Sequence, residues 1–470
     1  MTSVLSRRPR LNGSSIVISL LIFLLFVACS TPKSGAKTDP KKPSDTTVPS
    51  KDDKDKVRVY DPATGTYVLV PRDAVKVDTV KWTEEKTDPI LTDKSIPVDV
   101  PEKKSSYEIS ILIPLNSDNY VSLEGNMDSR LLRFMQYYGG MRIAALDAEN
   151  LGLPVKFRSF DTQISLSQLN TILKDPAVRR SDVIIGPYDK ENIEAVAAFG
   201  LENEKFVVSP WLPAFNIDNE NPFFIQVIPG LNTHAEAIMD FIDDQYSYKK
   251  VYLVARNNPT EIQRLNLFKK NTGVKSEDLI IDDSSIDLSK TNLGFLLDDP
   301  QGTIFVMPYY SKQDEDFVNS FLRKLHADKG SKDVIVFGLP QWTGYNNVNA
   351  NYMESLSVHI STGTYVNTRH SGYSNFRNKF FQQYFTMPDN QAYLGYDPLI
   401  WIAKTLAKDG PAGLVKETPS SEFGMASGFN LKPIYKEGIR KPAELKTPLY
   451  YENARVRILK FRDQDFELVR

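Results

Sequence analysis

The chain has few residues of the types that build disulfides and metal sites. It contains 1 cysteine, Cys29, and 4 histidines among 470 residues. One cysteine cannot form a disulfide within the chain, and it excludes cysteine-rich metal sites. The histidines lie far apart, without the spacing of a zinc site: His234, His326, His359 and His370. We therefore expect no metal site and no other cofactor.

Motifs of common enzymes and of nucleic-acid-binding proteins are also missing. The sequence GMASG at residues 424–428 does not have the G-x-S-x-G spacing of a hydrolase, and there is no phosphate-binding glycine loop. Asp314 and Asp316 lie among other charges, a pattern typical of a solvated face. The net charge is −2, with no basic block outside the N-terminal segment. We expect neither catalysis nor nucleic-acid binding.

The N-terminal residues have the pattern of a secretory signal. Arg7, Arg8 and Arg10 precede an uncharged, mostly apolar run at residues 16–28. This run is shorter than the about 20 apolar residues of a membrane-spanning helix. Residues 26–29, FVAC, resemble a bacterial lipobox, in which the cysteine is lipidated, although the motif prefers leucine at the first position. We expect residues 1–28 to be a lipoprotein signal peptide; an ordinary signal peptide with an incidental cysteine is the alternative.

Residues 29–106 contain little that can form a core. Residues 29–56 are rich in Pro, Lys, Asp, Ser and Thr, which predicts a disordered tether. Ser30 after the cysteine resembles the sorting pattern of outer-membrane lipoproteins that face the periplasm. Membrane contact is then expected through the lipid anchor only. Residues 57–106 are predicted to be extended, with a β-hairpin at residues 57–70, VRVYDPATGTYVLV.

The globular body is expected to begin at residue 107, and its clearest unit lies at residues 182–213. An apolar strand at 183–185 is followed by a helix at 192–201 and a strand at 206–208. This order is the βαβ unit of a parallel sheet, in which ligands bind beyond the carboxyl ends of the strands. The loops 186–189 and 209–211 should therefore lie side by side.

The same alternation continues through the body, which at about 360 residues is long enough for two domains. We expect further strands at residues 107–115, 155–160, 251–255, 303–307 and 334–337, and further helices at residues 134–148, 166–173, 235–243, 262–270 and 317–325. The fold class predicted by this order is α/β, with doubly wound parallel sheets.

Several segments in order resemble the type I periplasmic solute-binding family, the leucine-binding branch. They are YEISILIPL, AALDAEN, VKFRSFDTQ, DVIIGPY and VVSPW, followed by Tyr396-Asp397 with an apolar helix at 399–406, a glycine turn at 423–430 and a last strand at 455–460. The resemblance implies two lobes joined by three crossing segments, which we place near Gln226, Tyr365 and Met425. Lobe 1 is then about 107–225 and 365–424, and lobe 2 about 226–364 and 425–470.

The strand-end loops differ from those that the resemblance implies. Amino-acid binders of this family offer Ser or Thr hydroxyls and backbone amides to the ligand carboxylate, whereas this chain has bulky side chains there. Aromatic rings with a few polar groups are typical of ligand pockets and of interface hot spots. The candidate ligand-binding residues are Asn116, Ser117, Tyr188, Asp189, Ser209, Trp211, Asn257, Tyr309, Tyr310, Trp342 and Tyr365. We expect the rings of Tyr188 and Trp211 to face those of Tyr309, Tyr310 and Trp342 across the gap between the lobes. The alternative is that the rings only fill space between the lobes.

Two functions of different class remain open from the sequence. The first is a lipid-anchored envelope protein that binds a small solute, an amino acid or a derivative, between two lobes. The second is a scaffold with a degenerate cleft that regulates an envelope enzyme such as a peptidoglycan synthase. The expected partner is accordingly an amino-acid-like molecule or an envelope protein.

Overall fold

The chain divides into two compact units, Met1–Asp93 and Lys94–Arg470. In this computed structural model, the described residues are 56–61, 66–71, 104–117, 129–211, 219–270, 272–282, 288, 292–416, 424–436 and 447–469. The expected signal peptide, Cys29 and the tether up to residue 55 lie outside them. Within the first unit, β1 (Lys56–Asp61) pairs antiparallel with β2 (Thr66–Pro71), which confirms the expected hairpin.

The first sheet of the larger unit has seven strands in the order β13-β14-β7-β6-β5-β3-β4. They are β3 (Tyr107–Ile113), β4 (Val155–Asp161), β5 (Val183–Ile185), β6 (Phe206–Ser209), β7 (Phe224–Gln226), β13 (Leu431–Ile434) and β14 (Tyr450–Asn453). All neighbours are parallel except β13 and β14. Consecutive residues of a strand point to opposite faces, so short apolar runs such as β5 need cover on both sides.

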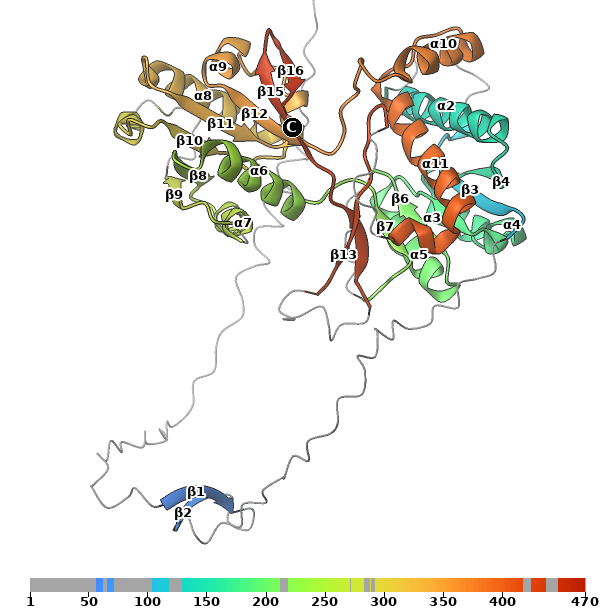
Figure 1. Ribbon diagram of the computed structural model, residues 1–470, viewed down its shortest axis with the longest axis horizontal. Helices are drawn as coiled ribbons and strands as arrows, with labels where there is room; N and C mark the ends of the chain where they lie inside the picture. The colour runs from blue at the N-terminus through green and yellow to red at the C-terminus, as the bar shows by residue number, and fades with distance from the viewer. Residues whose placement is uncertain are drawn as a thin grey trace, which may run out of the picture. The chain divides into compact units, whose positions relative to one another are not determined.

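Helices supply that cover on both faces of the first sheet (Figure 1). One face packs on α2 (Ser129–Asn150), α11 (Asn390–Asp409) and the short helix η6 (Pro411–Val415). The other face packs on α3 (Leu166–Ile172), α4 (Pro176–Arg180) and α5 (Lys190–Glu202). In addition, α10 (Tyr373–Tyr384) packs on α2 and α11.

The second sheet also has seven strands, in the order β16-β15-β12-β11-β10-β8-β9. They are β8 (Lys250–Arg256), β9 (Ser276–Ile281), β10 (Thr303–Val306), β11 (Val334–Gly338), β12 (Val358–Thr362), β15 (Arg457–Arg462) and β16 (Asp465–Leu468). One face packs on α6 (Leu231–Tyr246) and α7 (Pro259–Lys269). The other packs on α8 (Glu315–Lys329), α9 (Ala350–Ser355) and η3 (Gly294–Leu297). Two short helices, η4 (Lys312–Asp314) and η5 (Pro340–Gly344), follow β10 and β11.

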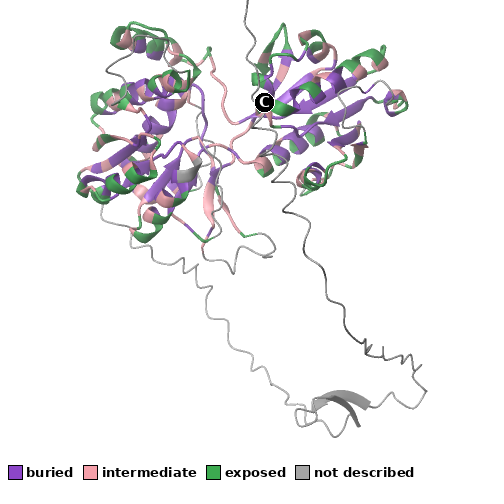
Figure 2. Cartoon of the chain, turned by 180° about the vertical axis from the view of Figure 1, so that it is seen from behind, coloured by how far each residue is buried: buried purple, intermediate pink, exposed green. Residues whose placement is uncertain are grey.

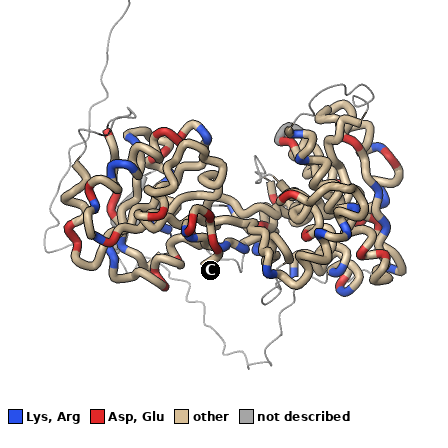
Figure 3. Tube along the Cα trace, turned by 90° about the horizontal axis from the view of Figure 1, so that it is seen from above, with Lys and Arg blue, Asp and Glu red and all other residues tan. Residues whose placement is uncertain are grey.

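Each sheet and its helices form one α/β lobe, as the sequence predicts. Figure 2 shows the buried residues concentrated on the strands and on the inner sides of the helices. Lys and Arg residues are interspersed with Asp and Glu along both lobes (Figure 3). The sheets are mixed rather than wholly parallel, because β15 pairs antiparallel with both β12 and β16.

The third crossing between the lobes lies later in the chain than expected. The first two crossings follow Gln226 and Thr362, near the expected positions. The third was expected near Met425, but the chain returns to the second sheet only between Asn453 and Arg457. The reason is that β14 pairs with β7 and so satisfies the edge of the first sheet, which would otherwise expose unpaired backbone groups.

Two glycines allow α2 and α11 to pack with their backbones in contact. A side chain on Gly140 would overlap the carbonyl of Ala392, and one on Gly395 would overlap the carbonyl of Tyr137. This close packing fixes the inner face of α2, from which Tyr137 reaches the strand ends.

Other differences from the sequence prediction concern elements with weak periodicity. The helix expected at 166–173 is followed by a second helix, α4, which begins where Asp175 caps it and Pro176 takes its first position. No sequence pattern predicted β7, β9, β12, β13, β14, β16, α9 or α10. In β9, SEDLII, polar residues occupy the first half of an edge strand, so no apolar run marks it.

Candidate functional site

The candidate residues lie in loops at the carboxyl ends of the parallel strands. In the first sheet these loops follow β3, β5 and β6, and in the second they follow β8, β10 and β11. Only Tyr365 lies elsewhere, in the second crossing. The carboxyl ends of parallel strands meet at one edge of a sheet, so each lobe presents its candidate loops together.

The loop after β3 is held by one carboxylate from β4. The backbone N–H of Asn116 donates to Asp161 Oδ1 at 3.0 Å, and the N–H and Oγ of Ser117 donate to Oδ2 at 2.7 and 2.8 Å. The N–H of Gln163 also donates to Oδ1, at 3.0 Å. Burial raises the pKa of Asp161, but these hydrogen bonds outweigh burial and lower the pKa below its usual value. The backbone donors of this loop are therefore used within the lobe.

The loop after β5 sends Tyr188 into the first lobe. Its ring is 5% exposed and makes edge contacts with Phe134, Tyr137 and Trp211, at centroid distances of 5.8, 5.2 and 5.2 Å. Burial raises the pKa of Tyr188 well above its usual value. Its hydroxyl donates to Met141 Sδ at 3.7 Å. We call these four rings the first-lobe aromatic cluster.

Trp211, which follows β6, is the half-buried member of this cluster. It packs on Phe134 and Tyr137, at centroid distances of 4.9 and 5.3 Å. The guanidinium carbon of Arg133 lies 5.9 Å from the centre of the indole, within the range of a cation–π contact. Trp211 thus retains accessible aromatic surface beside a positive charge.

Asp189 is the N-cap residue of helix α5, and its carboxylate accepts hydrogen bonds from the first turn. Its Oδ1 accepts from the backbone N–H of Asn192 at 3.1 Å, and its Oδ2 accepts from Asn192 Nδ2 at 3.0 Å. Backbone amides at a helix N-terminus attract anions, and here Asp189 is the anion. Ser209 is fully buried at the end of β6, where its carbonyl accepts from the N–H of Val227 at 2.9 Å.

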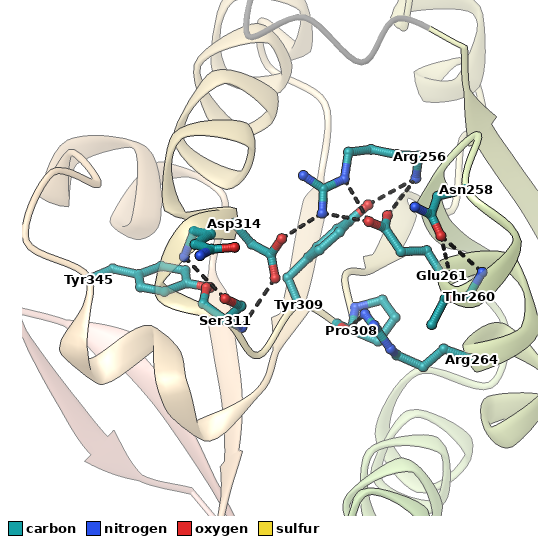
Figure 4. Close-up of polar contacts among 11 residues, drawn as sticks. Arg256, Asn258, Thr260, Glu261, Arg264, Pro308, Tyr309, Ser311, Asp314 and Tyr345 are labelled. Atoms are coloured by element: carbon teal, nitrogen blue, oxygen red, sulfur yellow. Dashed lines mark hydrogen bonds and ion pairs between the residues drawn. The ribbon is translucent and has the colours of Figure 1, made fainter. Parts of the chain in front are cut away.

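An arginine with two carboxylates dominates the strand ends of the second lobe (Figure 4). Arg256, at the end of β8, donates from Nε to Glu261 Oε1 at 2.8 Å and from NH2 to Asp314 Oδ1 at 2.5 Å. Its guanidinium carbon lies 5.2 Å from the ring centres of both Tyr309 and Phe317. Burial lowers the pKa of Arg256, but the two carboxylates outweigh burial and raise it above its usual value. This arginine is fully paired within its lobe.

Tyr309 and Trp342 are parts of the same lobe's core. Their exposed fractions are 1% and 2%. Trp342 Nε1 donates to the carbonyl of Tyr309 at 3.0 Å, and the Tyr309 hydroxyl accepts from the N–H of Arg256 at 3.1 Å. Burial and the charge of Glu261 raise the pKa of Tyr309 above its usual value. Both rings therefore support the strand-end loops from beneath.

Tyr310 and Asn257 are the accessible candidates of the second lobe. The Tyr310 side chain is 46% exposed, and the guanidinium carbon of Arg264 lies 4.4 Å from its ring centre. Arg264 also donates from NH1 to the carbonyl of Pro308 at 2.8 Å, which fixes the guanidinium over the ring. Asn257 is exposed, and its Nδ2 donates to Asp282 Oδ1 at 3.0 Å.

Tyr365 contributes its backbone to the crossing region. Its N–H donates to the carbonyl of Ala426 at 2.9 Å, and its carbonyl accepts from NH1 of Arg457 at 2.9 Å. The same NH1 donates to the carbonyl of Ala426 at 2.8 Å. Burial lowers the pKa of Arg457 to about 10.

The structure corrects the expectation that all five large rings face one another across a gap. Tyr188, Tyr309 and Trp342 are buried among the residues of their own lobes. Large aromatic side chains gain most when their whole surface is removed from water, and neighbouring rings provide that cover. Trp211 and Tyr310 keep accessible surface, and their contact with a ligand stays a prediction.

Sequence reasoning missed the arginines of this site. It selected Asn257 and passed over Arg256, whose carboxylate partners are 5 and 58 residues away in the sequence. Arg133 and Arg264 were missed as well, because each lies on a helix and contacts a ring that is distant in the sequence, Trp211 and Tyr310 respectively. The one signal in the sequence was a charged residue, Arg256, at the end of an apolar strand.

No group of three or more His, Cys, Asp or Glu side chains within the described residues is arranged to hold a metal ion. No helix in the same part of the chain has the length and apolar character to cross a membrane.

Solved structures of known proteins share this fold. A protein described as a branched-chain amino acid ABC transporter from Rhodospirillum rubrum matches with 13% identity and a TM-score of 0.56, covering 77% of this chain and 100% of its own. An ABC transporter substrate-binding protein from Desulfitobacterium hafniense matches with 15% identity and a TM-score of 0.51, and it also covers 77% of this chain and 100% of its own. A branched chain amino acid ABC transporter periplasmic ligand-binding protein from Burkholderia xenovorans matches with 14% identity and a TM-score of 0.50, covering 78% of this chain and 95% of its own.

These likenesses confirm the expected fold, that of the leucine-binding-like type I periplasmic binding proteins. A comparison with curated protein sequences gives no match. The model of one protein family, described as the receptor family ligand binding region, matches residues 144–408. Since this match takes in more than half of the 470 residues, the chain belongs to that family.

Proposed function

We propose that this chain is a binding protein of the cell envelope that takes a small solute, an amino acid or a derivative, between its two lobes. One observation carries the proposal. At the strand ends of each lobe, an accessible ring lies beside an arginine guanidinium: Trp211 with Arg133, and Tyr310 with Arg264. A flat or apolar part of the solute stacks on these rings, and an anionic group pairs with a guanidinium.

The structure also favours a particular place for the solute's negative charge. In amino-acid binders of this family, backbone amides and hydroxyls after the β5 strand receive the carboxylate. Here the carboxylate of Asp189 already accepts from the Asn192 amide, and it repels a second anion. The proposed solute therefore places its anionic group on Arg133 or Arg264, or it lacks a free carboxylate.

A thermal-shift screen tests the proposal directly. The full chain, purified in a nonionic detergent, is heated with single amino acids and with amidated or acylated derivatives. A solute present at a hundred times its dissociation constant adds about 2.7 kcal/mol to the free energy of unfolding. Stabilisation by at least one of these compounds is the expected result.

Two matched tyrosines then locate the bound compound. Tyr310→Ala should weaken binding by about 2 kcal/mol, as loss of an aromatic anchor often does. Tyr248 is 55% exposed and also has a cation over its ring, Lys249 Nζ at 5.0 Å, but it precedes β8 at the other end of the strand. Tyr248→Ala should leave binding unchanged. Equal effects of the two substitutions would place the compound outside the strand ends.

A second function, a scaffold that regulates an envelope enzyme such as a peptidoglycan synthase, is favoured by a different observation. Tyr188, Tyr309 and Trp342 are buried, and Arg256 is neutralised by two carboxylates, so much of the strand-end chemistry is used within each lobe. For this function we expect no thermal shift with any compound of the screen. Instead, a purified peptidoglycan synthase should change its rate when the chain is added.

We also propose that the chain is an outer-membrane lipoprotein facing the periplasm, held by a lipid on Cys29. The support is the lipobox-like FVAC at residues 26–29, preceded by a basic and then an apolar stretch. More than one acyl chain is needed for stable anchoring, and a lipidated N-terminal cysteine provides several. Residues 29–56 then separate the folded units from the bilayer.

A further inference from the structure

A cavity lies in the first lobe, away from the strand-end loops. It has a volume of about 620 Å³, a size typical of small-molecule sites. Its walls come from α11, the start of α10, η6 and the segment at residues 424–431. None of the candidate residues at the strand ends lines it. The cavity is therefore separate from the site of the proposed function.

One face of α11 forms the floor of this cavity. Trp401, Lys404 and Lys408 line it, at helical spacings of three and four residues, so they lie on the same side of the helix. The opposite side of α11, with Leu399, Ile402, Ala403 and Leu406, is buried against the sheet and α2. The packing of that apolar side leaves the Trp401 side turned toward the cavity.

Trp401 gives the cavity a fixed aromatic wall. Its ring stacks on Phe429, with centroids 4.4 Å apart and planes 9° from parallel. Phe429 is 4% exposed and belongs to the core, so it holds the indole in place. Trp401 itself is only half-buried, which leaves part of its surface for a ligand. A ring already held in position loses little freedom when another flat group stacks on it.

The charges around the cavity are unevenly paired. Asp147 already receives Lys379 Nζ at 2.5 Å and the Tyr396 hydroxyl at 2.9 Å. Asp397 accepts backbone N–H groups from residues 425–427. By contrast, Lys404 and Lys408 are exposed, and neither forms an ion pair with any described residue.

A third lysine belongs to this group of weakly paired positive charges. Lys416, which follows η6, also lines the cavity, and its ion pair with a described residue is a long one, to Asp409 at 3.8 Å. Lys404 and Lys408 are four residues apart on one helix, where like charges repel each other. An anion placed between them would remove this repulsion.

We propose that this cavity binds a flat organic anion, with its ring on Trp401 and its carboxylate or phosphate on Lys404 and Lys408. Along α11, Lys404 and Lys408 lie about 4.5 and 10.5 Å from Trp401 at a rise of 1.5 Å per residue. A ligand of one or two fused rings with a charged substituent spans this distance. The inference does not depend on a solute at the strand ends.

Calorimetric titration with defined probes tests the proposal on the full chain in nonionic detergent, against a detergent blank. The anionic probes are 2-naphthoate and 2-naphthyl phosphate, and the comparison probes are neutral 2-naphthol and cationic 2-naphthylmethylammonium. At least one anion should bind with a dissociation constant below about 1 mM. The neutral and cationic compounds should bind at least about tenfold more weakly. The tighter of the two anions identifies carboxylate or phosphate as the natural group.

Lysine substitutions locate the bound anion. Lys404→Gln with Lys408→Gln should weaken binding about tenfold or more, because each exposed charge contributes a few-fold. Replacing the same two lysines with arginine should preserve binding. The matched control is Lys156→Gln with Lys174→Gln, two exposed lysines of the same lobe that do not line the cavity.

Four results would overturn the proposal. They are no binding of either anion, equal binding of 2-naphthol, unchanged affinity in the Lys404 and Lys408 glutamine variant, and loss of binding in Tyr310→Ala. The last result would place the probe at the strand ends. Because the two lysines are exposed, their replacement should not change the thermal midpoint, which confirms that a loss of affinity is not a loss of fold.

Discussion

At the residue scale, most strand-end side chains of this protein are committed to partners within their own lobe. Asp161 holds the loop after β3, Asp189 caps α5, and Arg256 joins two carboxylates. Each pairing follows from the cost of leaving a charged or polar group without a partner when it is partly removed from water. Because of these pairings, few groups at the strand ends remain for a ligand. They are Trp211, Tyr310 and the arginines beside these two rings.

Asp161→Asn tests how far one carboxylate organises the loop at residues 116–117. Asparagine keeps one acceptor oxygen but turns an NH2 group toward backbone donors, so we expect a loss of about 1 kcal/mol of unfolding free energy at pH 7, discounted for partial exposure. The pKa of Asp161 is lowered in the folded protein. Its contribution is therefore present above the unfolded pKa of about 3.9 and is lost as pH falls through the folded pKa.

The difference in unfolding free energy between wild type and Asp161→Asn should accordingly grow between pH 3 and pH 6. Urea unfolding at several pH values measures it. Glu149→Gln, at an exposed carboxylate of α2, provides the control and should show no such trend. A difference that is constant with pH would mean that Asp161 is not the charge that holds the loop.

At the element scale, helix α6 depends on a strand of the other lobe for its N-terminal cap. Gly230 at the cap position has no side chain to accept from the helix. Instead, Glu452 of β14 accepts from the N–H of Gly230 at 2.8 Å and from the Thr233 hydroxyl. A carboxylate at a helix N-terminus is favoured by the helix dipole. The first element of lobe 2 is thus tied to the last strand of lobe 1, beside the first crossing.

Glu452→Gln tests this tie through its pH dependence. Burial raises the pKa of Glu452, and the hydrogen bonds from Thr233 and Gly230 only oppose that effect. A carboxyl group with a raised folded pKa contributes stability that is fully present below the unfolded pKa, about 4.3, and is lost as pH rises through the folded pKa. Glutamine does not titrate, so the stability of wild type relative to the variant should fall between pH 4 and pH 7.

Unfolding in guanidinium chloride at pH 4 and at pH 7 measures the difference in stability between wild type and Glu452→Gln. Asp240→Asn changes an exposed carboxylate on α6 itself and should leave the pH trend of the wild type intact. If the relative stability of wild type rose over this range, the Glu452 carboxylate would be favoured by folding, and the assignment of burial as the dominant cause would be wrong.

At the scale of the whole molecule, the two lobes are joined by three crossings, and the chain ends in the lobe that it enters last. Arg457, after the third crossing, donates to the carbonyls of Tyr365 in the second crossing and of Ala426. Asn453 donates from Nδ2 to the carbonyl of Val227 in the first crossing at 3.1 Å. Side chains from the third crossing therefore connect all three.

Anchoring is the other property of the whole molecule, and Cys29→Ser tests it. Serine cannot accept the lipid, so the variant should remain an uncleaved precursor or leave the outer-membrane fraction. Membrane fractionation with immunodetection distinguishes these forms by size and location. Ser30→Ala, one residue later, is the matched control and should still be lipidated and cleaved. Normal, mature Cys29→Ser protein in the outer membrane would refute the lipobox.

The α/β class and the positions of the central strands along the chain follow from the sequence alone. Residues 183–185 and 304–307 are uninterrupted apolar runs, and such runs need helices on both faces of the sheet. Their spacing with amphipathic helices leaves a parallel, doubly wound sheet as the solution. The hairpin at 57–70 was also readable, because two short runs rich in Val and Tyr around a turn that contains Pro and Gly are a local signal.

By contrast, the folded structure was needed to show which lobe contains β14, which rings remain accessible, and which carboxylates pair with Arg256. Trp211 and Trp342 both follow a buried strand, yet one is half-buried and the other 2% exposed. Likewise, Glu452 caps a helix that begins more than 200 residues earlier in the chain. Local sequence carries the preference of each segment for helix or strand, but burial and charge pairing are set by neighbours that are distant in the sequence and become adjacent only when the chain folds.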